Sequence, residues 1–152
     1  MLTTQPITIV VERTYAASPE AVFDAWLDLA TAGRWLFATP GGEMQRVEID
    51  PRIGGEFLIV ERREAGDAEH FGTYREIDRP RRLAFTFAAM RDVEPTLVTI
   101  EIAPTEAGCG LKLTHQMDPR WAEYKARTRE GWAHILAGLA GEVEPERDKI
   151  GR

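Results

Sequence analysis

The sequence predicts an α+β fold in which a curved seven-stranded antiparallel sheet wraps around one long C-terminal helix. The first observation is the order of the elements, because one strand is followed by two short helices, six further strands and a final helix. The second is the short turns between those six strands, which favour an antiparallel meander. The third is that one amphipathic helix covers only one face of such a sheet, so the sheet should curl around it.

The N-terminal part combines a β-branched segment with two short helical segments. Residues 7–15, ITIVVERTY, are rich in residues that prefer strands. Ser18 is a good N-cap, and Pro19 suits the first position of a helix. The apolar face of this helix is formed by Val22, Phe23 and Trp26. Residues 30–37, ATAGRWLF, are typical of a second short helix.

Six short strand segments come next, separated by turns that contain Gly, Pro or Asp. They cover residues 43–50, 54–63, 69–77, 82–90, 96–104 and 109–117. Gly72 stands inside the third of these segments, where a glycine often marks a bend or a close approach of two backbones. We expect this glycine to help the sheet close around the helix.

The last element is a helix for which Asp118 is the N-cap and Pro119 the first residue. Mostly aromatic and aliphatic side chains repeat at intervals of three and four and form one stripe. The stripe consists of Trp121, Tyr124, Thr128, Trp132, Ile135, Leu139 and Val143. A glycine inside a helix is unfavourable relative to alanine. We therefore expect Gly131, beside Trp132, to let a strand approach the helix backbone closely.

Composition and charge restrict the class of protein. The 152 residues suffice for a single domain, with its core at about residues 7–143 and a polar tail at 144–152. The net charge of −6 disfavours nucleic acid as a partner, because phosphate binding needs a basic face. No apolar segment approaches the roughly 20 residues that span a bilayer, so we expect no membrane insertion. The single cysteine, Cys109, and the lack of a signal-peptide pattern favour the cytoplasm.

Several motifs occur in a fixed order between about residues 7 and 143. They are ERTYAASPEAVFDAWLD, the Trp35 that follows it, DPRIGGEF, FGTYREIDRPRRLAFTF, GLKLTH and the GW…IL…L of the last helix. In this combination the chain resembles the START-like (SRPBCC) superfamily. Within it, the chain is similar to bacterial proteins that resemble the C-terminal domain of the activator of the heat-shock-protein-90 ATPase. Two positions depart from the usual pattern: Phe37, near where a second Trp is common, and Ile53, where Pro often precedes the two glycines.

The resemblance implies a helix-grip fold with a cavity between the sheet and the C-terminal helix. It implies no single activity, because members bind lipids, sterols or polyketide-like molecules, act as cyclases, or serve as co-chaperone domains. Our leading hypothesis is a binding protein for a small apolar or aromatic molecule. Apolar walls of the cavity would supply affinity, and a few polar groups would orient the ligand.

Strand alternation identifies candidate polar groups. His115 shares a face with Leu111 and Leu113, so it should point inward, where a polar group needs a hydrogen-bond partner. It is either a core histidine bonded to a backbone carbonyl or a cavity histidine that bonds a ligand oxygen. Tyr124 is likewise either core packing or, with Thr128, a source of cavity hydroxyls.

Aromatic and aliphatic residues of the predicted strands and helices complete the candidate site. Trp35, with Trp26, should hold the short helices against one end of the sheet, or it forms a lid over the cavity with Phe37. The candidate ligand-binding residues are His115, Tyr124, Thr128, Trp132, Trp35, Phe37, Phe57, Tyr74, Phe85, Phe87, Val98, Ile100 and Leu113.

Two alternative functions stay open. A cyclase or hydrolase would use the same cavity, with His115 as its general acid or base. A co-chaperone-like module with a chaperone partner would instead present an exposed apolar or charged patch on the convex face of the sheet. The three histidines are scattered and lack the spacing of a metal site, so we expect no metal and no cofactor. A homodimer is compatible with the predicted sheet.

Overall fold

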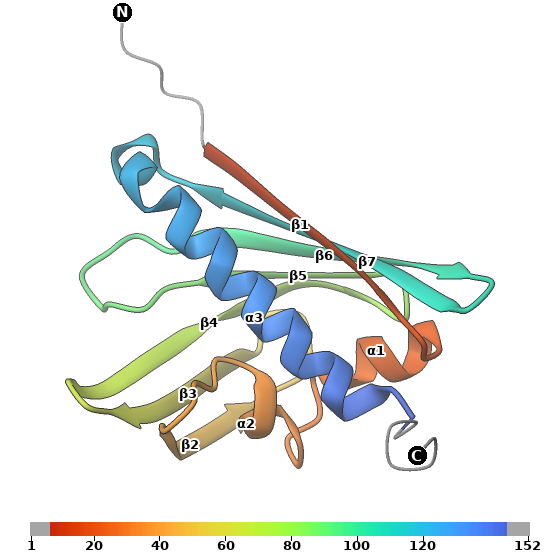
Figure 1. Cartoon of the computed structure of the whole chain (residues 1–152). Coiled ribbons are helices and arrows are strands. Elements are labelled where there is room, and N and C mark those ends of the chain that lie inside the picture. Colours follow the sequence, from red (N-terminus) through yellow and green to blue (C-terminus); the bar gives the residue numbers. More distant parts are fainter. Residues whose placement is uncertain (1–6, 146–152) are drawn as a thin grey trace, which may run out of the picture.

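A curved antiparallel sheet wraps around a long C-terminal helix in the computed structural model, which describes residues 7–145 (Figure 1). The seven strands have the order β1-β7-β6-β5-β4-β3-β2. They are β1 (Ile7–Tyr15), β2 (Glu43–Ile49), β3 (Glu56–Arg63), β4 (Gly66–Asp78), β5 (Arg82–Phe87), β6 (Thr96–Thr105) and β7 (Gly108–Met117). This arrangement is the predicted helix-grip fold, and the predicted fold class is therefore confirmed.

Two short helices follow the first strand, as the sequence predicts. They are α1 (Pro19–Ala25) and α2 (Ala32–Trp35). Ser18 caps α1, because its Oγ accepts a hydrogen bond from the backbone N–H of Ala21 at 3.1 Å. The predicted apolar face of this helix is buried in the core. The two helices close the end of the sheet at which the C-terminal helix also ends (Figure 1).

The C-terminal helix begins later than predicted. Asp118 caps a 3₁₀ helix, η1 (Pro119–Tyr124), and the α-helix proper is α3 (Lys125–Val143). The 3₁₀ helix is itself irregular at Trp121, whose φ of −101° and ψ of 21° are not helical. As a result Tyr124 is 39% exposed and packs against Trp121, with ring centroids 5.8 Å apart. The prediction that Tyr124 belongs to the stripe facing the sheet is wrong, because this change of helix type turns it away from the core.

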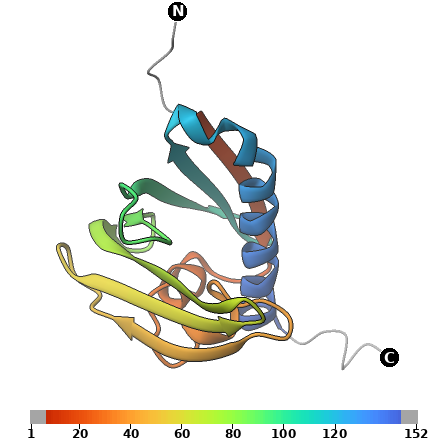
Figure 2. The ribbon, with the colours of Figure 1, turned by 90° about the vertical axis from the view of Figure 1, so that its left-hand side faces the viewer.

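The core lies between α3 and the concave face of the sheet. On α3 the buried residues are Trp132, Leu136, Leu139 and Ala140. The predicted stripe is correct at Trp132 and Leu139, whereas Ile135, Val143 and Thr128 are only half-buried. The helix lies alongside β1 and against α1 and α2, while β3 and β4 lie farther across the concave side (Figure 2). None of the helices within residues 7–145 is long and apolar enough to cross a membrane.

Two glycines were predicted to permit close packing, and only one does so. A Cβ on Gly72 would lie 1.7 Å from the carbonyl oxygen of Thr86, so the close backbone approach in β4 is confirmed. A Cβ on Gly131 would meet nothing within 4 Å, so the expectation that a strand approaches α3 there is wrong. The close contact on α3 is instead at Gly138, where a Cβ would lie 3.3 Å from the Cβ of Trp35.

Gly72 and Gly131 predict opposite effects of the same substitution. Gly72→Ala should lower the free energy of unfolding by about 2–3 kcal/mol, because β4 and β5 must separate to admit the methyl group. Gly131→Ala, in the exposed helix, should raise it by up to about 1 kcal/mol. Urea denaturation of the two variants and the wild type provides the measurement. A Gly72→Ala protein as stable as wild type would contradict the close approach.

Candidate ligand-binding site

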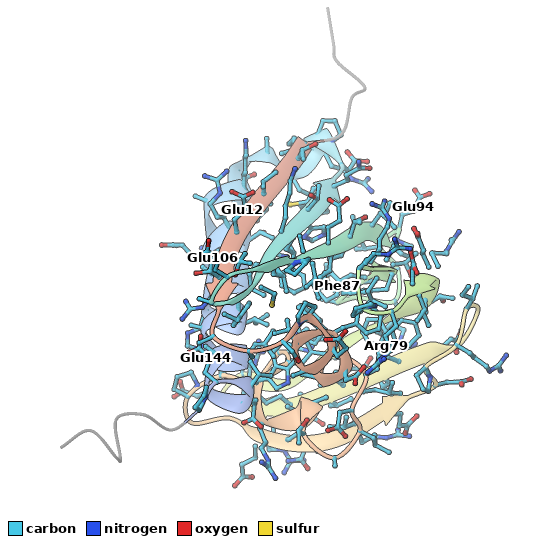
Figure 3. All side chains as sticks on the ribbon, turned by 90° about the vertical axis from the view of Figure 1, so that its right-hand side faces the viewer. Glu12, Arg79, Phe87, Glu94, Glu106 and Glu144 are labelled. Atoms are coloured by element: carbon cyan, nitrogen blue, oxygen red, sulfur yellow. The ribbon has the colours of Figure 1, made fainter. Side chains whose placement is uncertain are left out.

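Most of the predicted site residues line one buried interior between the concave face of the sheet and α3. The fully buried ones are Trp35, Phe37, Phe57, Tyr74, Phe85, Val98, Ile100, Leu113, His115 and Trp132. Phe87, labelled in Figure 3, and Thr128 are half-buried, whereas Tyr124 lies outside this interior. The helix α3 does not lie over the inner face of β3–β5. Aromatic side chains fill that space instead.

The ring of Phe37 occupies a slot between aromatic side chains of three elements. It stacks on His70 of β4 with centroids 4.4 Å apart and planes 2° apart, and it lies 5.2 Å from Phe87 of β5. It also packs in an edge-to-face arrangement with the indole of Trp132 on α3, with centroids 5.7 Å apart. We call the space bounded by His70, Phe87 and Trp132 the Phe37 slot. Phe37 has a φ of 60°, a left-handed backbone conformation that is uncommon for an aromatic residue.

A buried carboxylate fixes the loop that carries Phe37. Glu61 on β3 accepts hydrogen bonds from the backbone N–H and the hydroxyl of Thr39, both at 2.8 Å. Arg63 pairs with Glu61 at 2.7 Å and also donates to the carbonyl oxygen of Phe37 at 3.2 Å. Burial alone would raise the pKa of the Glu61 carboxyl, but these hydrogen bonds and the charge of Arg63 lower it overall. The carboxylate is therefore ionised and holds residues 37–39 against β3.

His115 points inward as predicted, and its hydrogen bonds fix its tautomer. The indole N–H of Trp132 donates to His115 Nδ1 at 2.9 Å, so the imidazole proton is on Nε2. That Nε2–H donates to the hydroxyl of Thr96 at 2.7 Å, and the hydroxyl donates to the carbonyl of Phe87 at 3.2 Å. The partners differ from the backbone carbonyl that we considered for a core histidine. Both ring nitrogens are engaged, which gives His115 a packing role.

Both buried histidines are neutral near pH 7. Burial lowers the pKa of His115 to about 4. Burial is also the main cause that lowers the pKa of His70 to about 4, although its hydrogen bond to the carbonyl of Ile59 raises it in part. The interior therefore presents uncharged aromatic surfaces, apart from the paired Glu61 at its margin.

The free space inside is small because the aromatic side chains fill it. A cavity of about 10 Å³ is lined by Trp26, Leu36, Phe57, Tyr74, Leu83 and Phe85. This is about the volume that one water molecule needs, so a larger ligand enters only if side chains move. A larger open groove of about 830 Å³ lies among β1, β6 and β7. Charged residues such as Glu12, Glu101 and Lys112 line that groove, and it contains none of the predicted site residues.

Two tryptophans beside the small cavity lack hydrogen-bond partners. Trp26 and Trp35 form an edge-to-face pair with centroids 4.8 Å apart, and both are buried. Among the residues that the structure describes, their two Nε1 atoms are the fully buried side-chain nitrogens and oxygens without a partner. The predicted packing of these tryptophans at the sheet end agrees with the structure, but the sequence did not reveal the unpaired donors.

Sequence reasoning missed three residues that shape the site. Glu61 lies two residues after Ile59 and four after Phe57, so strand alternation could have placed it on the inner face. His70 precedes Gly72 and Tyr74 at the same spacing, but the direction of this strand's side chains was ambiguous from the sequence. Nothing in the sequence around Thr96 indicated that its side chain would contact this interior. Within residues 7–145 no group of three or more His, Cys, Asp or Glu side chains is placed to hold a metal ion.

Comparisons with known proteins agree with this architecture. The family model described as "AHSA1: Activator of Hsp90 ATPase homolog 1-like protein" matches residues 16–144. No curated protein matches the chain.

Solved structures from several bacteria share the fold. A protein from Chromobacterium violaceum is 27% identical with a TM-score of 0.81, and the match covers 91% of this chain and 98% of that one. An AHSA1 protein from Silicibacter pomeroyi is 26% identical with a TM-score of 0.75, over 90% and 96%. A Staphylococcus aureus protein of unknown function is 17% identical with a TM-score of 0.80, over 90% and 92%, and shows likeness of fold alone.

The hydrogen bonds and the ion pair of Glu61 predict that the protein loses stability when this carboxylate is replaced. Glu61→Gln should lower the free energy of unfolding at pH 7 by about 1–3 kcal/mol, because the charge-assisted bonds from Arg63 and Thr39 are lost or weakened. The pKa of Glu61 is lower in the folded protein, so its contribution is complete above pH 4.5 and is lost as the pH falls through the folded-state pKa. The difference between variant and wild type should therefore shrink in acid. Urea denaturation at pH 7 and at about pH 3 tests this, with Glu43→Gln, an exposed glutamate, as control.

The buried histidines predict a second pH dependence. The pKa of His115 is about 4 when folded and 6.5 ordinarily, so the unfolded chain binds the extra proton first. The contribution of neutral His115 to the free energy of unfolding should be complete above pH 6.5 and should decrease as the pH falls toward 4. His115→Gln keeps a donor and an acceptor but does not titrate, so it should show a shallower decrease, with the remainder due to His70. Denaturation at pH 7 and 5, with His134→Gln as the exposed control, measures this. An unchanged slope in His115→Gln would refute it.

Proposed function

Because the chain belongs to the family of Activator of Hsp90 ATPase homolog 1-like proteins, we propose that it binds a small apolar or aromatic molecule between the sheet and α3. The observation that carries this proposal is the Phe37 slot. A ring supplied by a loop, rather than by a strand or α3, fills the part of the interior that the helix does not cover. The loop ring closes the site when the protein is empty, and the ligand replaces it.

The backbone of Phe37 supports this exchange. A bulky residue at positive φ costs on the order of 1–3 kcal/mol, which the packing of its ring must offset. When a ligand takes over the contacts with His70, Phe87 and Trp132, the loop is free to leave the left-handed conformation. Strain of this kind is concentrated at ligand clamps and switch regions.

Binding would draw on the apolar walls of the site. The inner faces of β3, β5 and β6 supply aromatic and β-branched side chains, which give affinity without directional contacts. His115 and Trp132 form one wall, and their ring nitrogens are already hydrogen-bonded to each other and to Thr96. The ligand therefore meets this wall through its ring surfaces.

The two alternative functions gain less support. Acid or base catalysis by His115 would require breaking one of its two hydrogen bonds, and its low pKa makes it a weak base at pH 7. A chaperone-binding face would need an exposed patch on the convex side. Among residues 7–145, the large aliphatic side chains that are exposed on the outward face of the strands are Val10 and Leu97, at 38% and 37% exposure. Two such side chains make an apolar patch smaller than those that usually mark protein interfaces. A partner on this side would therefore have to recognise charged residues, such as Glu12, Glu101 and Lys112 of the open groove among β1, β6 and β7.

Removal of the closing ring is the direct test. Phe37→Ala should bind the uncharged fluorescent probe N-phenyl-1-naphthylamine about tenfold more tightly than wild type, because the probe no longer competes with the Phe37 ring. Ile53→Ala removes an aliphatic side chain that is 64% exposed and should leave the affinity unchanged. Native mass spectrometry of the protein purified from its own host should also reveal an adduct that denaturation releases. Equal, weak probe binding by all three proteins together with a clean unliganded mass would sink the proposal.

A further inference from the structure

The outward face of β1, β7, β6 and β5 carries its charged side chains in a single row. On each of these strands, side chains that point away from α3 alternate with buried ones. The pairing register places one charged residue of each strand side by side on this outward face. Across the sheet these residues are Glu12 (labelled in Figure 3), Lys112, Glu101 and Arg82. Their charges alternate in sign, and we call them the charged row.

The rest of this outward face is uncharged. In the described strands, the row on one side of the charged row consists of Val10, Thr114, Thr99 and Ala84. The row on its other side consists of Thr14, Gly110 and Ala103. Charged residues make up 29% of the whole chain, so a face of several strands with charges in only one row is depleted of them. Depletion of charge is typical of the central part of protein interfaces.

Half of the charged row is unpaired within the part of the chain that the structure describes. Arg82 forms ion pairs with Glu101 at 2.8 Å and with Glu76 of β4 at 2.9 Å. Lys112 lies between two glutamates but forms a salt bridge with neither, and Glu12 has no partner among residues 7–145. An open groove of about 830 Å³ lies over this half of the row. The charges of Lys112 and Glu12 are therefore accessible to a second molecule.

A row of alternating charges that ends on opposite signs is complementary to its own reverse. A twofold axis parallel to the strands and between β6 and β7 would bring the reversed row of a second copy onto the first. Lys112 would then face the partner's Glu101. In the same way Glu12 would face the partner's Arg82. The axis also sets the uncharged rows against each other, because it places β1 over the partner's β5. In such an isologous contact each pair occurs twice.

We propose that a second copy of this chain docks on this face, sheet against sheet, to form a twofold-symmetric dimer through the charged row. Stacked sheets lie about 10 Å apart, a gap that a lysine and a glutamate from opposite sides bridge together. The charges of the row sum to zero, which matters because the chain as a whole carries −6 and two copies otherwise repel. This face lies opposite the Phe37 slot, so the inference does not depend on the proposed function.

The size of the face sets the expected strength of the dimer. The distance from β1 to β5 across the four strands is about 15 Å, which is small for a specific interface. We therefore expect a dissociation constant on the order of 10 μM at low ionic strength. Sedimentation velocity over a range of protein concentrations measures it.

Two charge reversals test the pairing. Lys112→Glu sets carboxylates against each other at both symmetry-related contacts, and Glu101→Lys sets ammonium groups against each other. Each variant alone should self-associate at least about tenfold more weakly than wild type. An equimolar mixture of the two variants should regain the dimer, because the two reversed residues then attract each other. Restoration by mixing is a result that a loss of charge pairing within one chain would not produce.

Matched controls separate this contact from the net charge. Lys125→Glu and Glu43→Lys change exposed residues outside the face and alter the net charge by the same amounts. Alone or mixed, they should dimerise as wild type does. Urea denaturation of all four variants verifies that each is folded.

Three results would overturn the inference. A wild type that stays monomeric up to about 500 μM would show that no second copy docks here, and the face would then serve another partner. A dimer that persists in both Lys112→Glu and Glu101→Lys would use a different surface. Two folded variants that stay monomeric when mixed would refute the twofold pairing.

Discussion

The contact between α3 and the curved sheet is the constraint on which the rest of the structure depends. Only four residues of this 19-residue helix are buried, and all of them lie between Trp132 and Ala140. Two hydrogen bonds anchor that segment: Trp132 donates to His115, and the hydroxyl of Tyr15 donates to the carbonyl of Leu136, both at 2.9 Å. Because the helix is held beside β1, it leaves the inner faces of β3 and β4 without a helix above them. Something else must cover these faces, and the loop after α2 provides Leu36 and Phe37.

Periodic sequence patterns predicted the helices and strands, whereas the site depends on features that do not repeat along the sequence. The strands and the first helix follow from alternation, from turn residues and from Ser18 and Pro19, all of which act locally. The start of α3 was predicted too early, because Asp118 and Pro119 begin a 3₁₀ turn as readily as an α-helix. Gly131 was assigned a packing role that belongs to Gly138, since the face of a helix that meets a neighbour depends on tertiary contacts.

The residues that close the site were harder to predict for physical reasons. The left-handed backbone of Phe37 is adopted because its ring gains contacts with three other elements, and no local rule anticipates such a gain. His70 faces inward on a strand whose pairing shifts register between Tyr74 and Glu76, so counting along it is unreliable. The family resemblance supplied the fold and the presence of an interior, but not which side chains fill it.

The polar groups of the interior differ in whether they are satisfied, and this difference bears on function. His115, His70 and Glu61 all have partners, so they stabilise the closed form and offer little to a ligand. In the proposed exchange, a ligand ring in the place of Phe37 would regain roughly the stacking that Phe37 gave up, so the exchange by itself would yield little net affinity. The net gain must come from what the closed form lacks. Relief of the left-handed backbone at Phe37 is one such source.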